Sequence, residues 1–287
     1  EVNIWHYDFT FDENKTSTML GISPTGLVFL NGARKTPIDG VIAFYIPDKA
    51  RQALVDTCFE QEIFSCDHTY IDPKESAPLP AVSTGIRIGD AEKWIHDYTS
   101  TPPEAVEQFE RAIRTACYVN NWLNPDFETL LAGLQDETEP DEPYLSILRA
   151  AVDQNVIEVT QPEALFEAVE PSLSAASNLT RYHAATIAAQ AAHAADRSAA
   201  QRTELLHQLL DDDDDEVTDA AGDLLSEMLV FDGELVASIL DSDDDAVTEQ
   251  AVAQLPEIAK DHPGRFAPHT ETFATLLREG NTSIRRD

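Results

Sequence analysis

The chain has 287 residues, of which 43% are apolar, and its 53 acidic and 19 basic side chains give a formal net charge of −34. Such an apolar content is enough for one or two folded cores, which excludes a disordered tail. No stretch approaches the roughly 20 apolar residues of a membrane-spanning helix. The negative charge also disfavours contact with nucleic-acid phosphates.

The few basic residues are mostly arginine, with 13 arginines and 6 lysines. This composition resembles that of proteins from extreme halophiles, in which surface carboxylates hold water and salt screens their repulsion. We therefore predict a cytoplasmic protein of a high-salt cell. Export stays open, because the chain begins at Glu1 without a methionine and looks trimmed. A sharper alternative is that the acidity imitates DNA or binds a basic partner.

Two parts of the chain differ in charge. Residues 1–125 contain 18 acidic and 10 basic residues, whereas residues 126–287 contain 35 and 9. Residues 135–143, which follow Leu134, are polar or proline throughout and indicate a solvated segment. We predict a domain at 1–125, an acidic linker with a connecting helix at 126–160, and a helical region at 161–287.

The first domain opens with strand patterns. Residues 2–11 alternate apolar and polar side chains, and residues 25–31 form a second β candidate. Residues 82–88 and 93–98 flank Gly89-Asp90 in the pattern of a β-hairpin. The sequence therefore predicts four strands, paired in an antiparallel sheet.

Two helices are expected between and after these strands. Pro47 opens the first, which runs through Phe59 with Leu54 and Cys58 on one face. The segment Thr101-Pro102-Pro103-Glu104 has the form of a capping box before the second. The predicted order is β-β-α-β-β-α, an α+β domain.

Some residues of this first domain are similar to those of a known family. They are Gly26-Leu27-Val28-Phe29 and a helix that ends in Phe59-Glu60-Gln61-Glu62-Ile63-Phe64, followed by a strand pair and a closing helix. This order resembles a small α+β domain family known only as a domain of unknown function, over roughly the first 122 residues. The resemblance implies a fold but no activity.

The second half contains an internal repeat. Residues 205–218 and 235–248 place the same kinds of apolar residues in one register thirty positions apart. A third copy contains Phe273, Leu276, Leu277 and Ile284, and a looser early copy includes Leu179-Thr180. Each unit is a pair of amphipathic helices that cannot cover its own apolar faces, so the copies are expected to stack.

This repeat resembles the HEAT-repeat family, in its short haloarchaeal form. The similarity is closest at residues 262–268 and 276–285, where Ile284-Arg285 matches the Val-Arg usual at the start of the second helix. The resemblance implies an all-α, right-handed solenoid of about three to four repeats at 161–287. The last copy is expected to be truncated, because the chain stops at Asp287.

Two aspartate-rich runs are weak candidates for a calcium site. They fail the EF-hand pattern, because Glu216 and Ala246 stand where that loop needs glycine. Their equivalent places in consecutive repeats favour helix capping instead. The weak metal candidates are Asp211, Asp213, Asp215, Asp241, Asp243 and Asp245.

No catalytic residue and no cofactor is predicted. The chain contains no G-x-S-x-G, H-E-x-x-H, Walker or G-x-G-x-x-G motif. Cys66 and His68 would share one face of a strand, but the other ligands of a zinc site are missing nearby. The remaining cysteines, Cys58 and Cys117, are interpreted as buried apolar residues.

We predict a non-catalytic scaffold or adaptor that binds a protein partner through the helical-repeat surface. The alternative is an enzyme, or a lyase-like or regulatory protein, with a pocket at the domain junction. The aromatic residues that would gather there are Trp94, Tyr98, Trp122 and Tyr144. A third possibility is that the first domain alone is functional and the helical array is a spacer.

Overall fold

The computed structural model describes residues 2–9, 16–71, 81–99, 102–136, 138 and 140–195, together with residues 205, 212, 214, 217 and 218. The chain divides into two compact units, Glu1–Glu158 and Val159–Asp287. None of the helices within these described ranges is long and apolar enough to cross a membrane.

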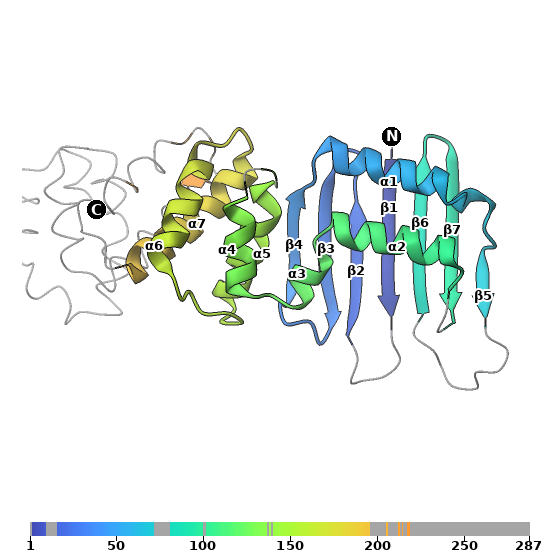
Figure 1. Cartoon of the computed structure of the whole chain (residues 1–287), viewed down its shortest axis with the longest axis horizontal. Helices are drawn as coiled ribbons and strands as arrows, with labels where there is room; N and C mark the ends of the chain where they lie inside the picture. Colours follow the sequence, from blue (N-terminus) through green and yellow to red (C-terminus); the bar gives the residue numbers. More distant parts are fainter. Residues whose placement is uncertain are drawn as a thin grey trace, which may run out of the picture. The chain divides into compact units, whose positions relative to one another are not determined.

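A seven-stranded sheet forms the first unit, in the order β4-β3-β2-β1-β6-β7-β5. The sheet is mixed, because β5 runs parallel to β7 and all the other neighbours are antiparallel (Figure 1). The strands are β1 (Val2–Phe9), β2 (Ser17–Ile22), β3 (Leu27–Arg34), β4 (Gly40–Tyr45), β5 (Thr69–Ile71), β6 (Ala81–Ile88) and β7 (Ala91–Tyr98).

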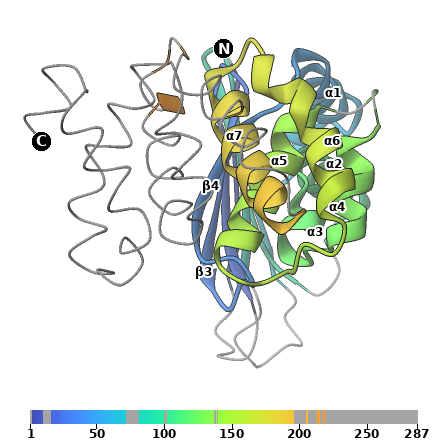
Figure 2. The same ribbon diagram turned by 90° about the vertical axis from the view of Figure 1, so that its left-hand side faces the viewer.

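Helices cover one face of this sheet. They are α1 (Asp48–Glu60), α2 (Glu104–Ala116) and α3 (Val119–Leu123), and Figure 2 shows them together on one side of the strands. The side chains between helices and sheet are buried and apolar, as strand alternation and helix periodicity require. They include Ile4, Leu20, Val28, Leu30, Phe44, Ile86, Ile95, Leu54, Phe109 and Ile113.

The α+β class of the first domain is confirmed, but the predicted antiparallel sheet of four strands is wrong, because the sheet has seven strands and is mixed. Four strands precede α1, where the sequence pattern indicated two, and three strands lie between α1 and α2. In β4, buried Ile42 and Phe44 alternate with exposed Val41 and Tyr45, so both faces of the strand are apolar. The period-two pattern that marks a strand is therefore absent there.

Of residues 126–160, predicted as an acidic linker and connecting helix, residues 126–158 belong to the first unit. They form α4 (Phe127–Leu134) and α5 (Asp141–Asp153), and α5 packs along β4. Glu142 Oε1 accepts a hydrogen bond from the Tyr45 N–H at 2.6 Å, and Ser146 Oγ donates to the Ala43 carbonyl at 3.0 Å. Helix α5 thus covers the edge of the sheet and satisfies backbone groups that an edge strand leaves unpaired.

The two prolines expected to start helices occupy the position just before them. Pro47 precedes α1 and Pro103 precedes α2, and neither helix has a side-chain hydrogen bond to its cap. Thr101 of the predicted capping box lies outside the described residues. A side-chain cap is present at α4, where Asp126 accepts from the Thr129 N–H at 2.9 Å.

The second unit begins with a helix pair. Helix α6 (Pro162–Val169) leads through the short 3-10 helix η2 (Glu170–Ser174) into α7 (Asn178–Ala194), and α6 packs against α7. The buried residues include Leu165, Phe166, Val169, Ala184, Ile187, Ala188 and Ala191. The copies predicted from residue 235 onward lie outside the described residues, so the solenoid stays a prediction.

Candidate binding surfaces of the first unit

The second face of the sheet carries a row of aromatic side chains. Trp5 on β1 is paired in register with Gly21 on β2 and with Gly85 on β6. Gly21 is in turn opposite Phe29, and Gly85 is opposite Trp94. Aromatic and very small residues therefore alternate across the strands, which lets large rings lie over the glycine backbones.

Several of these rings stack on one another. The Trp5 and Trp94 ring centroids are 5.5 Å apart with an interplanar angle of 18°. Tyr7 and His96 lie nearly parallel to Trp94, at 6.2 and 6.3 Å. The Arg87 guanidinium lies 6.0 Å from the centroid of the Trp5 ring, which is within the range of a cation–π interaction. The cluster is thus fixed by its own contacts before any partner binds.

Gly21 and Gly85 differ in what lies above them. A Cβ atom added at Gly85 would be 2.8 Å from the Trp94 ring, so this ring rests on the glycine backbone. A Cβ atom added at Gly21 would meet no atom within 4 Å among the described residues. The space above Gly21, between Trp5 and Phe29 in the register, is therefore open. We call it the Gly21 slot.

This difference predicts opposite effects of one substitution at two related positions. Gly21→Val should raise the free energy of unfolding by about 0.5–1 kcal/mol, because valine suits a strand and the added methyl groups have room. Gly85→Val should lower it by about 1–3 kcal/mol, because Trp94 must move. Urea unfolding of both variants measures these changes. Equal destabilisation would show that the space above Gly21 is filled.

The open face is apolar and close to neutral. Phe29, Val41 and Tyr45 are 44%, 59% and 40% exposed, which is high for such side chains in a sheet. On its described central strands β1, β2, β6 and β7, the charged side chains are Arg87 and Glu92. Because the whole chain carries −34, this near-neutral surface is suited to contact with a partner and not to hydration.

A row of hydrogen-bonded polar side chains lies on the covered face, beneath α2. The Thr84 hydroxyl donates to Glu110 Oε1 at 2.9 Å and is 2.9 Å from His6 Nδ1. When Glu110 is ionised and accepts the Thr84 proton, His6 Nδ1 donates to Thr84 Oγ1. Burial, helped by the charge of Arg114, lowers the pKa of His6 from 6.5 to about 4, so the imidazole is neutral.

Carboxylates from two strands lie around these hydrogen-bonded side chains. Burial is the main reason that the pKa of Glu110 rises from 4.5 to about 7, and the charges of Asp97 and Asp8 add to the rise. Asp97 is buried and accepts hydrogen bonds from Thr99, and Asp8 lies 3.9 Å from the Arg114 guanidinium. No group of three or more potential metal ligands was found within the described ranges.

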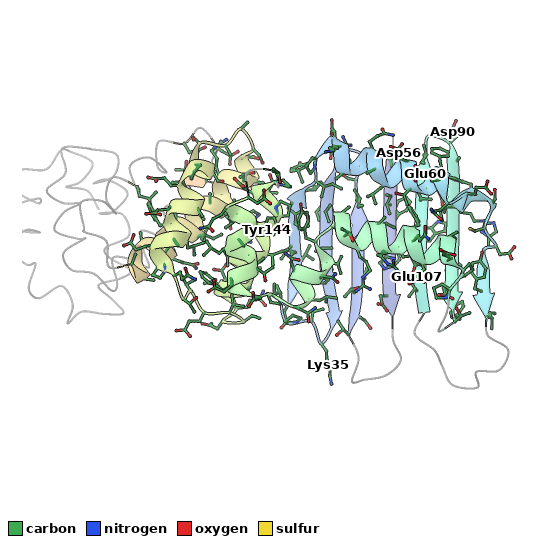
Figure 3. The ribbon with its side chains drawn as sticks, in the orientation of Figure 1. Lys35, Asp56, Glu60, Asp90, Glu107 and Tyr144 are labelled. Carbon is green, nitrogen blue, oxygen red and sulfur yellow. The ribbon has the colours of Figure 1, made fainter. Side chains whose placement is uncertain are left out.

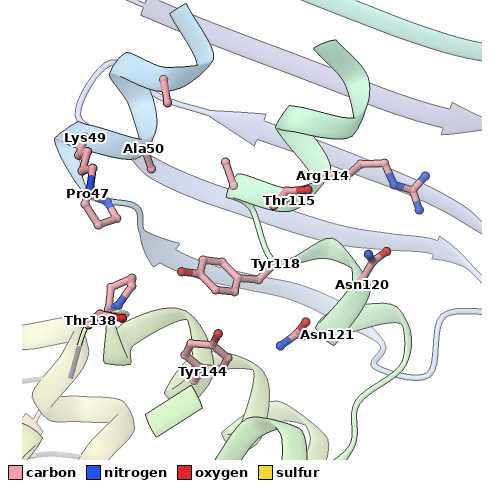
Figure 4. A pocket seen from close by; sticks show the side chains of 13 residues that line it. Pro47, Lys49, Ala50, Arg114, Thr115, Tyr118, Asn120, Asn121, Thr138 and Tyr144 are labelled. Atoms are coloured by element: carbon pink, nitrogen blue, oxygen red, sulfur yellow. The ribbon is translucent and has the colours of Figure 1, made fainter. Parts of the chain in front are cut away.

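A cavity of about 510 Å³ lies at another place in the first unit, where α1, α2, α3 and α5 meet. Its walls include Lys49 of α1, Thr115 of α2, Asn121 of α3 and Tyr144 of α5, with Tyr118 between α2 and α3 (Figure 4). Of the residues that the structure describes, no Asp, Glu, His or Cys lines this cavity. These described residues offer hydroxyl, amide and cationic groups for binding, and none of them has a carboxylate or an imidazole that could act as a base.

The six aspartates proposed as weak metal ligands lie outside the described residues. Their neighbour Asp214 accepts a hydrogen bond from the Val217 N–H at 3.4 Å, as a residue capping a helix does. Asp212 binds Arg181 through two hydrogen bonds of 2.7 and 2.8 Å. These two members of the first run thus have structural partners.

The four aromatic residues expected at a domain junction do not gather. Trp94 and Tyr98 lie on β7, on the open face, whereas Trp122 is buried in α3 and Tyr144 lines the cavity. Cys66 and His68 also have separate roles, since His68 Nδ1 contacts the Trp94 carbonyl at 3.0 Å. Sequence reasoning missed Arg87 and the two glycines opposite Trp5, although the aromatic alternation of residues 2–11 was a signal for this face.

Residues 17–117 match the model of a family described as Domain of unknown function (DUF6438). The match begins at the first residue of β2 and ends one residue after α2, so it contains six of the seven strands and omits β1, which carries Trp5 and Tyr7. No curated protein matches the chain.

Proposed function

We propose that the protein is a non-catalytic binding protein and that the open face of its sheet, around the Gly21 slot, docks a partner protein. One observation carries this proposal. The stacked Trp5–Trp94 pair is partly exposed beside an open slot and is fixed by Tyr7, His96 and Arg87. Fixing large rings in advance reduces the entropy that is lost when a partner binds.

The composition of this face favours a protein as the partner. Tryptophan, tyrosine and arginine dominate the binding energy of protein interfaces, and Trp5, Tyr7 and Arg87 lie together here. The near absence of carboxylates on the central strands lowers the cost of removing water from the face. A side chain of the partner, aromatic or proline, would stack in the Gly21 slot between Trp5 and Phe29.

The helical region has a second role in this proposal. We infer that the helix pairs from residue 161 onward stack as a HEAT-like solenoid and extend the contact with the same partner. The packing of α6 against α7, with alanine and leucine-like residues between them, supports this inference. The acidic composition supports a setting in a high-salt cytoplasm.

Capture of partners by slot variants tests the proposal. The full-length wild type and the Trp5→Ala and Gly21→Val variants are immobilised and exposed to a lysate in molar KCl. Proteins held by the wild type should fall by at least about tenfold on both variants, because one removes the ring and the other fills the slot. Quantitative mass spectrometry measures the captured amounts.

Phe59→Ala is the matched control for that experiment. Phe59 is an exposed aromatic residue, 59% accessible, but it lies on α1 and not on the open face. Its variant should capture the same proteins as the wild type. Capture that survives Gly21→Val, or that falls equally with Phe59→Ala, contradicts docking at the Gly21 slot.

A further inference from the structure

The cavity bounded by α1, α2, α3 and α5 is not used by the sheet-face proposal. Its volume of about 510 Å³ is in the range of small-molecule sites. All the residues that line it belong to the first unit, Glu1–Glu158. The chemistry of its walls therefore indicates the class of ligand that it takes.

Two tyrosines form a fixed aromatic wall. The Tyr118 and Tyr144 rings meet edge to face, with centroids 5.1 Å apart and an angle of 72°, and Tyr118 packs in the same way on Phe44. The ring of Tyr144 also rests on the backbone of α4, because a Cβ atom at Gly133 would be 2.2 Å from it. An aromatic ligand would find this wall already in place.

The backbone at Tyr118 is held in an unusual conformation. Its φ of 52° and ψ of 29° lie in the left-handed region, which costs a non-glycine residue on the order of 1 kcal/mol. This conformation separates α2 from α3 and places the ring in the middle of the cavity wall (Figure 4). The strained residue and the cavity thus coincide.

The charge of the lining is opposite to that of the chain. The chain has 53 acidic and 19 basic residues, yet among the described residues the lining includes Lys49 and Arg114 and no carboxylate. Arg114 is partly neutralised by Asp8 at 3.9 Å, and in Figure 4 it points away from the space. Lys49 is an exposed cation at the wall across from Tyr144.

We propose that this cavity binds a small aromatic anion. The ring of the ligand packs against Tyr118 and Tyr144, and its carboxylate or phosphate group lies next to Lys49. Asn121 and Thr115 supply further polar contacts at the rim. A neutral ring would lack the contact with Lys49, and a bare anion would lack the aromatic wall.

Isothermal titration of the full-length chain with matched probes tests this proposal. Benzoate and phenyl phosphate carry both features, and together they distinguish a carboxylate from a phosphate group. Benzyl alcohol and benzylamine carry the ring without the negative charge, and inorganic phosphate carries the charge without the ring. At least one of the two aromatic anions should bind about tenfold more tightly than each of the other three probes.

Two variants locate the binding. Lys49→Glu should weaken the binding of the aromatic anion by about tenfold or more. Ala53→Phe, at an exposed helical position in the cavity wall, should block it without a change of charge. Lys35→Glu makes the same charge change at an exposed lysine beyond the end of β3 and far from Tyr144 in Figure 3, so it should leave the binding unchanged.

Three results would overturn the proposal. One is that neither aromatic anion binds at millimolar concentration, and another is that the neutral or cationic ring binds as tightly. The third is that binding is unchanged in both Lys49→Glu and Ala53→Phe, which would place the ligand elsewhere. None of these results affects the sheet-face proposal, because the cavity and the Gly21 slot share no residue.

Discussion

A chain truncated after residue 125 is expected to lose its stable monomeric fold, whereas a chain that ends at residue 158 should keep it. The truncation removes α4 and α5, which lie within the first unit. It leaves the Tyr45 N–H, the Ala43 carbonyl and both backbone groups of Asp39 without the side chains that now pair them. Strand β4 would then be an open and apolar edge.

The free energy that α4 and α5 contribute through buried side chains is large compared with the stability of a domain. Burying one leucine-sized side chain contributes about 2 kcal/mol, and ordinary domains are stable by only about 5–15 kcal/mol. Several such side chains of α4 and α5 are fully or almost fully buried: Leu130, Leu131, Leu145, Ile147 and Leu148. Without these helices, the apolar surface against which they pack would be exposed to water.

Light scattering after size exclusion, combined with thermal unfolding, measures the outcome. The 1–158 chain should be a monomer with a cooperative transition, and the 1–125 chain should associate or unfold without one. A monomeric 1–125 chain that melts within a few degrees of the 1–158 chain would show that α4 and α5 contribute little to the stability of the domain.

The sequence predicts those elements whose two faces differ in polarity. The helix from Pro47 and the hairpin at Gly89-Asp90 have one buried and one polar face or a strong turn signal, and the structure contains them; of the predicted strand 2–11, β1 occupies the described residues 2–9. Strand β4 was missed because its outward side chains, Val41 and Tyr45, are as apolar as its inward ones. The exposed apolar side chains that remove the period-two signal of β4 are also part of the proposed binding surface.

The geometry of the site depends on pairing between distant residues. Gly21 and Gly85 lie 64 positions apart in the sequence, and both become neighbours of Trp5 only when β1 is inserted between β2 and β6. Periodicity within one strand carries no information about such partners. The same holds for the start of α5. Its acidic first turn looks solvated in the sequence, whereas Glu142 is buried and accepts a hydrogen bond from the Tyr45 N–H.

Replacing Glu110 by glutamine should change how stability depends on pH. The pKa of Glu110 is raised from 4.5 to about 7, so its contribution is fully present below pH 4.5 and is lost as the pH rises to 7. Glutamine keeps an oxygen for the Thr84 hydroxyl and does not ionise. Relative to wild type, Glu110→Gln should therefore gain about 3 kcal/mol in free energy of unfolding between pH 4.5 and 8.

Comparing two chains at each pH separates Glu110 from its neighbours. His6 acts in the opposite direction, because its pKa is lowered to about 4 and its contribution is lost as the pH falls below 6.5. This effect is common to both chains and cancels in the difference. Glu107→Gln is the control, since Glu107 lies on the same helix but is 54% exposed and paired with Arg111. Urea unfolding at several pH values should show the gain for Glu110→Gln only, and a difference that is constant with pH would mean that Glu110 ionises in the fold as it does in water.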